Sequence, residues 1–465
     1  MKKKPICAIC ETCGFLVFLL CVLCVSAVSF SQTTNKSDGL DGMTDEALMN
    51  ELASRGLNSL LERAFEVNKV PESERQGKRT LISLSRLSDP SAKLSVAQRQ
   101  QTVGEIVHGV EQALPSINDP NLLMRQAFVL ITEGVERDVN TLEYWGPNPR
   151  AQATLRPIVQ TVIKILDKCA ERAKAQADEV SNKITTPNSP YIYRYEELER
   201  LGSTAEYTRN MVQYYLALSI DPASPERKKI ANEAAEYLKQ FDVPENPDRC
   251  VVRNRMAKLA MVKGDFEGAK KLFAAVMNDS GEPKPTVAQQ YEARYFTAVA
   301  DLLAKNLAGA KKGLADLQAW QGANLPDDKT AREGAEAAAF MLQYRILSLE
   351  AEQTHDPAAK AQANDKAVAV LMELLGKRPE LRSIIYDQLL PKLEEKADLT
   401  KVEPLMLRAL VSRGEQEIQR PREEPADRKT LEKAIDAAKE IVRRRGQPGV
   451  EGQMVDASAL LVPFF

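Results

Sequence analysis

The sequence has few of the residues on which catalysis and metal binding most often depend. It contains two histidines and two tryptophans in 465 residues, and aromatic residues make up 6% of the chain. Catalysis of the Ser-His-Asp or Cys-His kind needs a placed histidine, and no nucleophile signature accompanies either one. Neither GxxxxGK(S/T) nor GxGxxG, the usual phosphate-binding patterns, is present. We therefore expect no enzyme activity, no cofactor, and no catalytic, cofactor-binding or metal-ligating residues.

An excess of charge of one sign is also lacking. Lys and Arg number 63 and Asp and Glu number 65, so the formal net charge is −2. Proteins that bind nucleic acid usually present a strongly basic face, so we do not expect a nucleic-acid partner. One short basic run, residues 443–445, ends a predicted helix, where it complements the negative end of the helix dipole. A binding patch is the alternative interpretation of this run.

The few residues that could ligate a metal or form a disulfide are scattered along the chain. His108 and Glu111 fall on one face of a predicted helix, as a pair of metal ligands would, but no third ligand is identifiable. His355 lies in a polar loop, where solvation is the simplest interpretation. Cys169 and Cys250 are the only cysteines beyond residue 24. They are either buried thiols or, in an oxidising compartment, the partners of one disulfide.

The N-terminus carries the pattern of an export signal. Three lysines follow Met1, and residues 14–30 form an apolar run that is short for a membrane span. Small residues after that run suit signal-peptide cleavage near residues 27–32. We interpret residues 1–31 as a signal peptide, or alternatively as an uncleaved signal anchor, and the polar residues 32–42 as a disordered linker. The protein is thus expected to be extracytoplasmic, periplasmic or secreted, or else tethered to the membrane by its N-terminal helix.

Beyond residue 43, nearly every segment has helical periodicity and none has the alternating pattern of a strand. The sequence therefore predicts an all-α fold, with one long helix over about residues 151–184. Residues 185–190, TTPNSP, are the clearest candidate boundary. We expect an N-terminal helical unit over 43–185, a repeat region over 191–380, and a C-terminal helical region over 381–465. The last residues, LLVPFF, are apolar, so the C-terminal region packs back, contacts a partner or is truncated.

One segment of the repeat region matches a known helical motif. Residues 264–273, GDFEGAKKLF, place a Gly-Asp-aromatic turn before a helix in which Phe273 follows Ala269 by four residues. This segment resembles the turn and second helix of the tetratricopeptide repeat (TPR), where a small residue lets two helices approach and a large one fills the adjacent gap. The same i, i+4, i+7 face recurs as Ala234/Leu238/Phe241, Ala269/Phe273/Val276, Ala310/Leu314/Leu317, Ala367/Leu371/Leu374 and, more weakly, Ala434/Ala438/Ile441.

The resemblance covers about residues 195–380. The first two spacings between the recurring alanines are near the family's period of about 34 residues, and the later ones are longer. It implies stacked antiparallel helical hairpins, a TPR-like α-solenoid whose concave surface holds peptides or partner helices; an irregular helical bundle is the alternative. With the leader, this predicts a non-catalytic extracytoplasmic scaffold for protein partners. The alternative function is a small-ligand-binding or enzymatic helical protein whose pocket is not visible in the sequence.

The rare aromatic residues could contribute to recognition or to packing. Trp145 falls at a helix–loop junction, where it either packs under the loop or lies in a recognition surface. Trp320 follows Leu314 and Leu317 on an apolar face, which favours core packing. The densest aromatic group either lines a groove entrance or covers the exposed edge of the first hairpin. It consists of Tyr191, Tyr193, Tyr195, Tyr207, Tyr214 and Tyr215.

Overall fold

The computed structural model describes residues 58–70, 96–325, 328–378, 399–402, 404–418 and 428–446, together with isolated positions between residues 48 and 83 and between 381 and 388. These residues form fifteen α-helices with short π and 3₁₀ segments, and no strand. The predicted all-α fold class is confirmed. The leader, the 32–42 linker, residues 447–465 and most of residues 381–396 lie outside the described residues.

The chain divides into two compact units, residues 1–335 and 336–465. In the first unit the elements are α3 (Asn58–Val67), α5 (Val96–Ala113), α6 (Pro120–Val129), π-helix η3 (Leu130–Val135), α7 (Glu136–Asn140), π-helix η4 (Thr141–Trp145), α8 (Pro149–Ser181), α9 (Ile192–Ser219), α10 (Pro225–Leu238), 3₁₀-helix η5 (Lys239–Phe241), α11 (Arg249–Lys263), α12 (Phe266–Met277), α13 (Val287–Leu303) and α14 (Leu307–Asn324). Helix α15 (Lys329–Gln353) crosses the division, and α16 (Pro357–Lys377), 3₁₀-helix η7 (Leu399–Lys401), α18 (Pro404–Ile418) and α19 (Arg428–Arg443) belong to the second unit.

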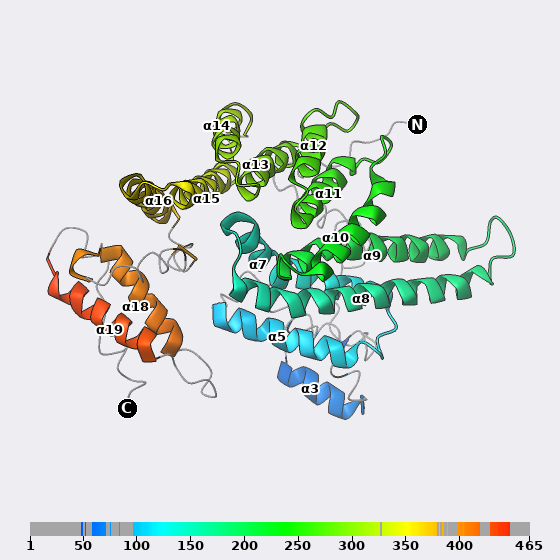
Figure 1. The fold of residues 1–465 in the computed structure, drawn as a ribbon. Coiled ribbons are helices and arrows are strands. Elements are labelled where there is room, and N and C mark those ends of the chain that lie inside the picture. Colours follow the sequence, from blue (N-terminus) through cyan, green and yellow to red (C-terminus); the bar gives the residue numbers. More distant parts are fainter. Residues whose placement is uncertain are drawn as a thin grey trace. The chain divides into compact units, whose positions relative to one another are not determined.

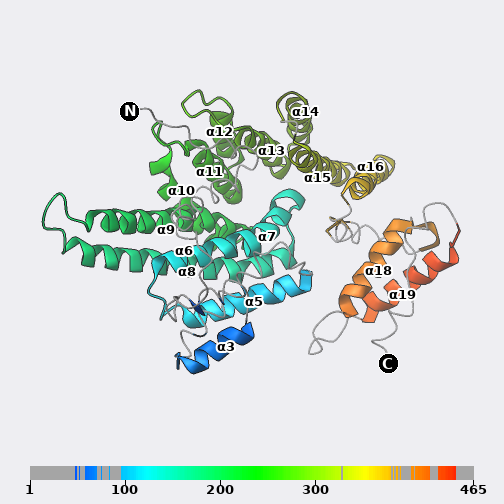
Figure 2. The ribbon, with the colours of Figure 1, turned by 180° about the vertical axis from the view of Figure 1, so that it is seen from behind.

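A long antiparallel hairpin of α8 and α9 dominates the first unit (Figures 1 and 2). Helix α8 starts at a capped turn, because the Asn148 side chain accepts a hydrogen bond from the Ala151 amide at 3.0 Å and Pro149 suits the first helical position. Its apolar face is buried against α9 on one side and α6 on another. The predicted helix at 151–184 is observed at Pro149–Ser181.

The divisions between compact units differ from the predicted ones. Residues 185–190 connect α8 to α9, and these two helices pack closely along their length, with Gly202 against Ala173. Because the two helices bury their apolar faces on each other, their connection is the turn of a hairpin within one unit. The observed division instead lies inside α15, between Ala335 and Glu336.

From α9 to α14 the helices form consecutive pairs. Each helix contacts the next one along the chain, and the first helices of the pairs also contact one another, α9 with α11 and α11 with α13. The alanine of each predicted triplet is fully buried, as are its apolar partners in most cases. The fully buried members are Ala234, Leu238, Ala269, Phe273, Val276, Ala310, Leu317, Ala367, Leu371, Leu374, Ala434, Ala438 and Ile441.

The turns within two of these pairs share one backbone geometry. Between α11 and α12, Gly264 has a φ of +84° and the Asp265 side chain accepts a hydrogen bond from the Gly268 amide at 2.9 Å. Between α13 and α14, Lys305 has a φ of +59° and the Asn306 side chain accepts from the Gly309 amide at 3.1 Å. Each turn therefore combines a left-handed residue that ends one helix with a side chain that caps the next.

In the second unit α18 and α19 pack together, and a charged group joins the end of α19 to the segment of η7 that precedes α18. The Glu440 carboxylate binds Arg443 and Arg444, both at 2.6 Å. Arg444 also donates to the carbonyl oxygens of Val402 and Leu399 at 2.6 and 2.7 Å. The predicted basic run at the end of α19 is thus partly used inside the unit, where it satisfies backbone groups as well as the helix terminus.

Candidate functional site

Polar side chains gather in two places in the first unit, in the interior around α11 and in an open groove on the surface. Helix α11 is buried along most of its length although it carries Arg249, Arg255 and Lys258, which are exposed by 2%, 4% and 6%. Buried charges are tolerated only when partners compensate them. The partners of these cations therefore decide whether the interior group is a candidate site or part of the packing.

Lys258 is the centre of the interior group. Its Nζ lies 3.0 Å from Glu143 Oε1, in the middle of η4, and 2.6 Å from Glu292 Oε1 on α13. The same Glu143 oxygen accepts a 2.7 Å hydrogen bond from the Tyr214 hydroxyl, and Asn254 donates to Glu292 Oε2 at 2.9 Å. These two carboxylates hold the pKa of Lys258 above its ordinary value despite burial, which acts in the opposite direction. The ammonium is fully engaged and joins three chain segments.

Arg255 lies beside Lys258 and contacts two tyrosines. Its guanidinium is 4.7 and 4.6 Å from the ring centroids of Tyr214 and Tyr215, and it donates to the Tyr215 hydroxyl at 2.9 Å. The Glu136 carboxyl on α7 is close enough to Arg255 and Glu133 for both charges to affect its pKa. Burial, with a smaller contribution from Glu133, raises the pKa of Glu136 to about 7, although Arg255 opposes the change.

A second ionic group fixes the start of α11. Arg249 and Asp279 form a bidentate pair, with Nη2 at 2.7 Å and Nε at 3.0 Å from the carboxylate oxygens. Arg249 also donates to the carbonyl oxygens of Glu282 and Pro283, and Arg253 binds the same carboxylate. These cations hold the pKa of Asp279 well below its ordinary value. In both interior groups the charges of Arg249, Lys258 and Asp279 are paired between chain segments, so these ion pairs are part of the packing of α11.

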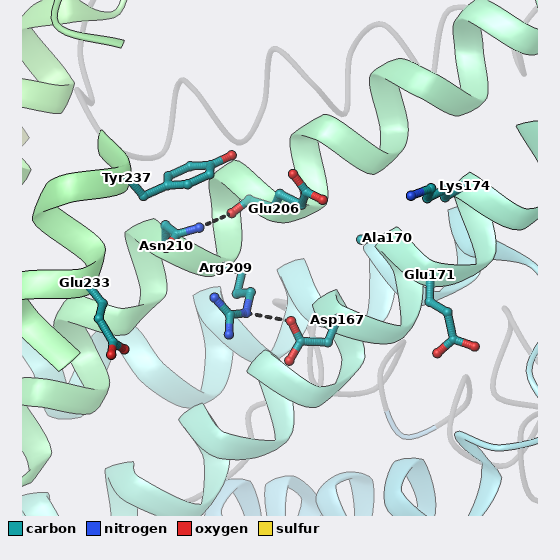
Figure 3. A pocket seen from close by; sticks show the side chains of 9 residues that line it. All are labelled: Asp167, Ala170, Glu171, Lys174, Glu206, Arg209, Asn210, Glu233 and Tyr237. Carbon is teal, nitrogen blue, oxygen red and sulfur yellow. Dashed lines mark hydrogen bonds and ion pairs between the residues drawn. The ribbon is translucent and has the colours of Figure 1, made fainter. Parts of the chain in front are cut away.

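The surface groove lies between α8, α9 and α10 and has a volume of about 540 Å³. Figure 3 shows side chains of all three helices around it. Its lining consists of Asp167, Ala170, Glu171 and Lys174 from α8, Glu206, Arg209 and Asn210 from α9, and Glu233 and Tyr237 from α10. Four carboxylates thus face two cations and one tyrosine, which makes the groove acidic on balance.

Two of the carboxylates have close cationic partners. Asp167 Oδ1 lies 2.5 Å from Arg209 Nε, a pair that crosses from α8 to α9 (Figure 3). Glu171 binds Lys168 at 2.9 Å. The other two are exposed and differently placed. Glu233 is 3.9 Å from Lys229, at the limit of an ion pair, and no described cation lies within that distance of Glu206. The negative charge of the groove therefore resides mainly on α9 and α10.

Asn210 and Tyr237 form the inner part of the groove. Asn210 is 7% exposed, and its Nδ2 donates to the backbone oxygen of Glu206 at 2.8 Å. Among the described residues, no donor reaches its Oδ1. Tyr237 is half-buried, with its ring 5.5 Å from that of Phe241. Burial and the nearby Glu206 raise the pKa of Tyr237, so its hydroxyl stays protonated and can donate a hydrogen bond.

The residues considered from the sequence lie elsewhere. The His108 ring is 2.9 Å from the Gln112 side chain, while Glu111 binds Lys164 at 2.7 Å and Thr161 at 3.2 Å. No group of three or more His, Cys, Asp or Glu side chains that could hold a metal ion occurs within the described ranges. His355 is exposed in the connection before α16.

The two cysteines are separate buried thiols and form no disulfide. Cys169 donates to the carbonyl oxygen of Pro120 at 3.2 Å. Burial raises the pKa of Cys169 to about 12 and that of Cys250 to about 11, so neither is a reactive thiolate. The sequence left two interpretations open, a disulfide or two buried thiols that pack like small apolar side chains, and the structure shows the second.

The aromatic residues divide between the interior and the surface. Trp145 is 6% exposed and packs, whereas Trp320 is only half-buried and stacks under the Arg294 guanidinium at 4.5 Å. The tyrosine group predicted from the sequence does not form one surface. Tyr191 and Tyr193 are exposed near the tip of the α8–α9 hairpin, and Tyr214 and Tyr215 belong to the interior group.

A comparison of the chain with protein-family models, curated proteins and solved structures finds no match. Within the described part of the chain, no helix combines the length and apolar character needed to cross a membrane. The groove itself was not anticipated from the sequence. Its residues come from three helices and look like ordinary wet-face residues, so only their Glu-rich composition on α9 and α10 was available as a signal.

Proposed function

We propose that this protein is a non-catalytic scaffold that binds partner proteins outside the cytoplasm. The observation that carries the proposal is the series of paired helices from α9 to α14, with matching turns after α11 and α13, beside an open groove. Paired helices that repeat in this way offer extended surfaces suited to peptides and partner helices. The TPR resemblance of residues 264–273 supports the same function.

The extracytoplasmic location is part of the proposal and rests on the N-terminal sequence. A basic start, an apolar run and small residues near position 29 are typical of an export signal. An uncleaved segment would instead tether the scaffold to the membrane. In either case the proposed partners are proteins, and membrane contact is confined to the N-terminal segment.

In-cell crosslinking of the tagged full-length protein tests this function. Cells are fractionated into cytoplasmic, membrane and extracytoplasmic parts, and captured species are identified by mass spectrometry. We expect one dominant protein partner and a location outside the cytoplasm. Recovery of the uncrosslinked protein from the extracytoplasmic fraction would contradict the scaffold and favour the small-ligand or enzymatic alternative. Recovery from the cytoplasm would contradict the location.

A further inference from the structure

One segment of the chain lies across three of the paired helices. The α7–η4 segment, Glu136–Trp145, precedes the pairs in the sequence, and it contacts the first helix of each pair, which are α9, α11 and α13. Figures 1 and 2 show α7 between α8 and these pairs. In repeats of helical pairs, the equivalent helices of successive pairs form an extended surface that receives partner segments. The segment therefore occupies the place that suits a bound partner helix.

Two consecutive side chains of the segment make the main contacts. The Glu143 carboxylate accepts a hydrogen bond from Tyr214 at 2.7 Å and binds the buried Lys258 at 3.0 Å. The ring of Tyr144 lies 5.0 Å from that of Tyr295. A carboxylate followed by an aromatic ring is thus held by a cation and by aromatic rings. The receiving side chains, which we call the inner surface, are Tyr214 of α9, Lys258 of α11, and Tyr295 and Phe296 of α13.

The polar groups of this contact are not all satisfied. Glu136 Oε1 on the segment and Asn254 Oδ1 on α11 are buried, and no donor in the described part of the chain bonds to either. The orientation of the Asn254 amide is settled by its other atom, because Nδ2 donates both to the Gln289 carbonyl oxygen and to the Glu292 carboxylate. Buried acceptors without donors are unfavourable. The segment is therefore held less completely than an ordinary core helix.

The backbone of the segment also departs from a regular helix. It contains the π-helix η4 and directly follows the π-helix η3, and π turns are uncommon and often mark functional positions. The segment ends at Gly146, whose φ of +97° favours glycine, and Pro147 and Pro149 follow. These breaks separate the segment from α8, so that it can leave the inner surface without unwinding that helix.

We propose that the α7–η4 segment is an internal occupant of a partner-binding surface, and that a helix of the partner protein displaces it. The partner helix presents a carboxylate followed by an aromatic residue, as Glu143 and Tyr144 do, because the inner surface offers a cation beside aromatic rings. This inference rests on the proposed scaffold function and adds to it the chemistry of the partner and its regulation. Occupancy by the segment lowers the apparent affinity for the partner, because only molecules with a vacated surface bind it.

Hydrogen exchange of the wild-type protein tests whether the segment opens. The full-length protein is deuterated under native conditions, and peptic fragments are measured by mass spectrometry. We expect residues 136–145 to exchange about tenfold faster, relative to their intrinsic rates, than residues 155–166, which carry the buried face of α8. Equally slow exchange of both ranges would mean that the segment separates only when the whole unit unfolds, and would overturn the inference.

A peptide with the sequence of the segment tests whether the inner surface is a receptor. The probe is an acetylated, amidated and dye-labelled peptide of residues 136–145, ERDVNTLEYW, and fluorescence anisotropy follows its binding. Glu143→Gln with Tyr144→Leu weakens the hold of the internal segment. This double variant is therefore expected to bind the peptide about tenfold more tightly than the wild type does. Equal affinity of the two proteins would contradict displacement.

Matched controls separate displacement from loss of structure. Glu179→Gln with Tyr193→Leu makes the same changes at exposed positions of the α8–α9 hairpin and should bind the peptide as the wild type does. A peptide with Gln and Leu in place of Glu143 and Tyr144 should bind the double variant about tenfold more weakly. Equal binding of the two peptides would show adhesion to exposed apolar surface and would overturn the inference. If the double variant loses its helical circular dichroism, Glu143→Gln alone is compared, with an expected tightening of about threefold.

In-cell crosslinking with the same variants separates this inference from the scaffold function. More captured partner with the Glu143→Gln and Tyr144→Leu variant than with the wild type and the control supports both. Equal capture by all three proteins leaves the scaffold standing, with its binding surface elsewhere, and overturns the inference. Peptide binding without any captured partner would overturn the scaffold function, although the inner surface would still receive the segment in trans.

Discussion

Helices α11 and α13 occupy equivalent positions in neighbouring helix pairs, yet they are buried in different ways. Helix α13 buries mainly Tyr295, Phe296, Val299 and small residues that let its neighbours approach, and its one buried charge, Asp301, lies near its end, where it binds Lys270. Helix α11 is buried along most of its length and carries Arg249, Arg255 and Lys258 inside. The two helices contact each other, and α13 supplies Glu292 to Lys258.

The comparison shows that equivalent positions in two helix pairs can be packed by apolar or by charged side chains. The two kinds of packing respond differently to substitution. An apolar helix tolerates changes of shape in proportion to the volume altered. An ionic helix depends on each partner being present, because an uncompensated buried charge is far more costly than a small cavity. Four predictions test or sharpen this comparison, from the largest expected effect to the smallest.

Loss of the central ammonium should have the largest effect. Lys258→Met leaves the Glu143 and Glu292 carboxylates without their cation, and Glu143 is buried. We expect the free energy of unfolding to fall by about 3–5 kcal/mol. Urea unfolding of the full-length protein measures this change through tryptophan fluorescence, since the only tryptophans, Trp145 and Trp320, both lie in the first unit.

Two variants serve as controls for that measurement. Lys271→Met removes an exposed lysine of α12 and should change the stability by about 0.5 kcal/mol or less. Adding Glu143→Gln to Lys258→Met should recover part of the loss, because it removes one of the uncompensated charges. A loss below about 1 kcal/mol for Lys258→Met would mean that the ionic filling of α11 is as tolerant as the apolar filling of α13.

This contrast also marks what the sequence could and could not predict. The recurring alanine faces and the turn at residues 264–273 depend on local spacing, and the burial of Ala269, Phe273 and Val276 follows the prediction. The burial of α11 could not be predicted, because its charges look like a solvated face until Glu143 and Glu292, distant in the sequence, are brought to Lys258.

The groove and the division of the chain escaped prediction for the same reason. Glu206 and Glu233 lie on different helices, and nothing in the spacing of either helix shows that they flank one tyrosine. The TTPNSP segment has the composition of a linker, but the packing of α8 on α9 makes it a hairpin turn. Composition identifies where the chain turns, and tertiary contacts decide whether that turn separates two units.

The close approach of α14 to α13 depends on one glycine. A Cβ added at Gly313 of α14 would lie 2.7 Å from the Ala298 Cβ and 3.1 Å from its Cα on α13. Gly313→Ala should therefore lower the stability of the first unit by about 1–3 kcal/mol. Gly322, on the same helix, has no atom within 4 Å of an added Cβ. Gly322→Ala should raise the stability by about 0.5–1 kcal/mol through helix propensity, and thermal unfolding compares the two.

The stability of the protein should depend on pH through the Glu136 carboxyl. The pKa of this carboxyl is about 7 in the folded protein, against an ordinary value of 4.5. The folded state thus binds its proton more tightly than the unfolded chain does. Stability falls as pH rises from about 4.5 to about 7, where the carboxylate faces Glu133 and, with opposite sign, Arg255. Glu136→Gln should remove that fall and leave the variant more stable by about 1–2 kcal/mol at about pH 8, with no gain at about pH 4.5.

Urea unfolding of the wild type and Glu136→Gln across that pH range measures the difference. The exposed Glu236→Gln on α10 is the matched control and should leave the pH profile unchanged. Parallel profiles for the wild type and Glu136→Gln would show that Glu136 ionises in the folded protein as it does in the unfolded chain. In that case the packing of the charged helix α11 would not depend on protonation of Glu136 on α7.

The smallest effect concerns the turns that follow α11 and α13. Both turns need a residue with positive φ, which is Gly264 in one and Lys305 in the other. A side chain in this conformation is strained by about 1 kcal/mol relative to glycine. Gly264→Ala should lower the stability by about that amount, and Lys305→Gly should raise it by about 0.5 kcal/mol, because the added backbone entropy of glycine offsets part of the gain.

Thermal unfolding of the two variants, singly and together, measures these effects. The turns are linked through Asp301, which binds Lys270 of α12 at 3.0 Å and accepts a hydrogen bond from Asn306 in the second turn at 3.0 Å. Departure of the double variant from additivity therefore measures this link. If Lys305→Gly instead lowers the stability, the side-chain interactions of Lys305 outweigh its strain, and the turns are alike in backbone alone. A gain for Lys305→Gly together with a loss for Gly264→Ala would mean that one turn geometry is imposed on both pairs by helix packing, whatever residue fills the left-handed position.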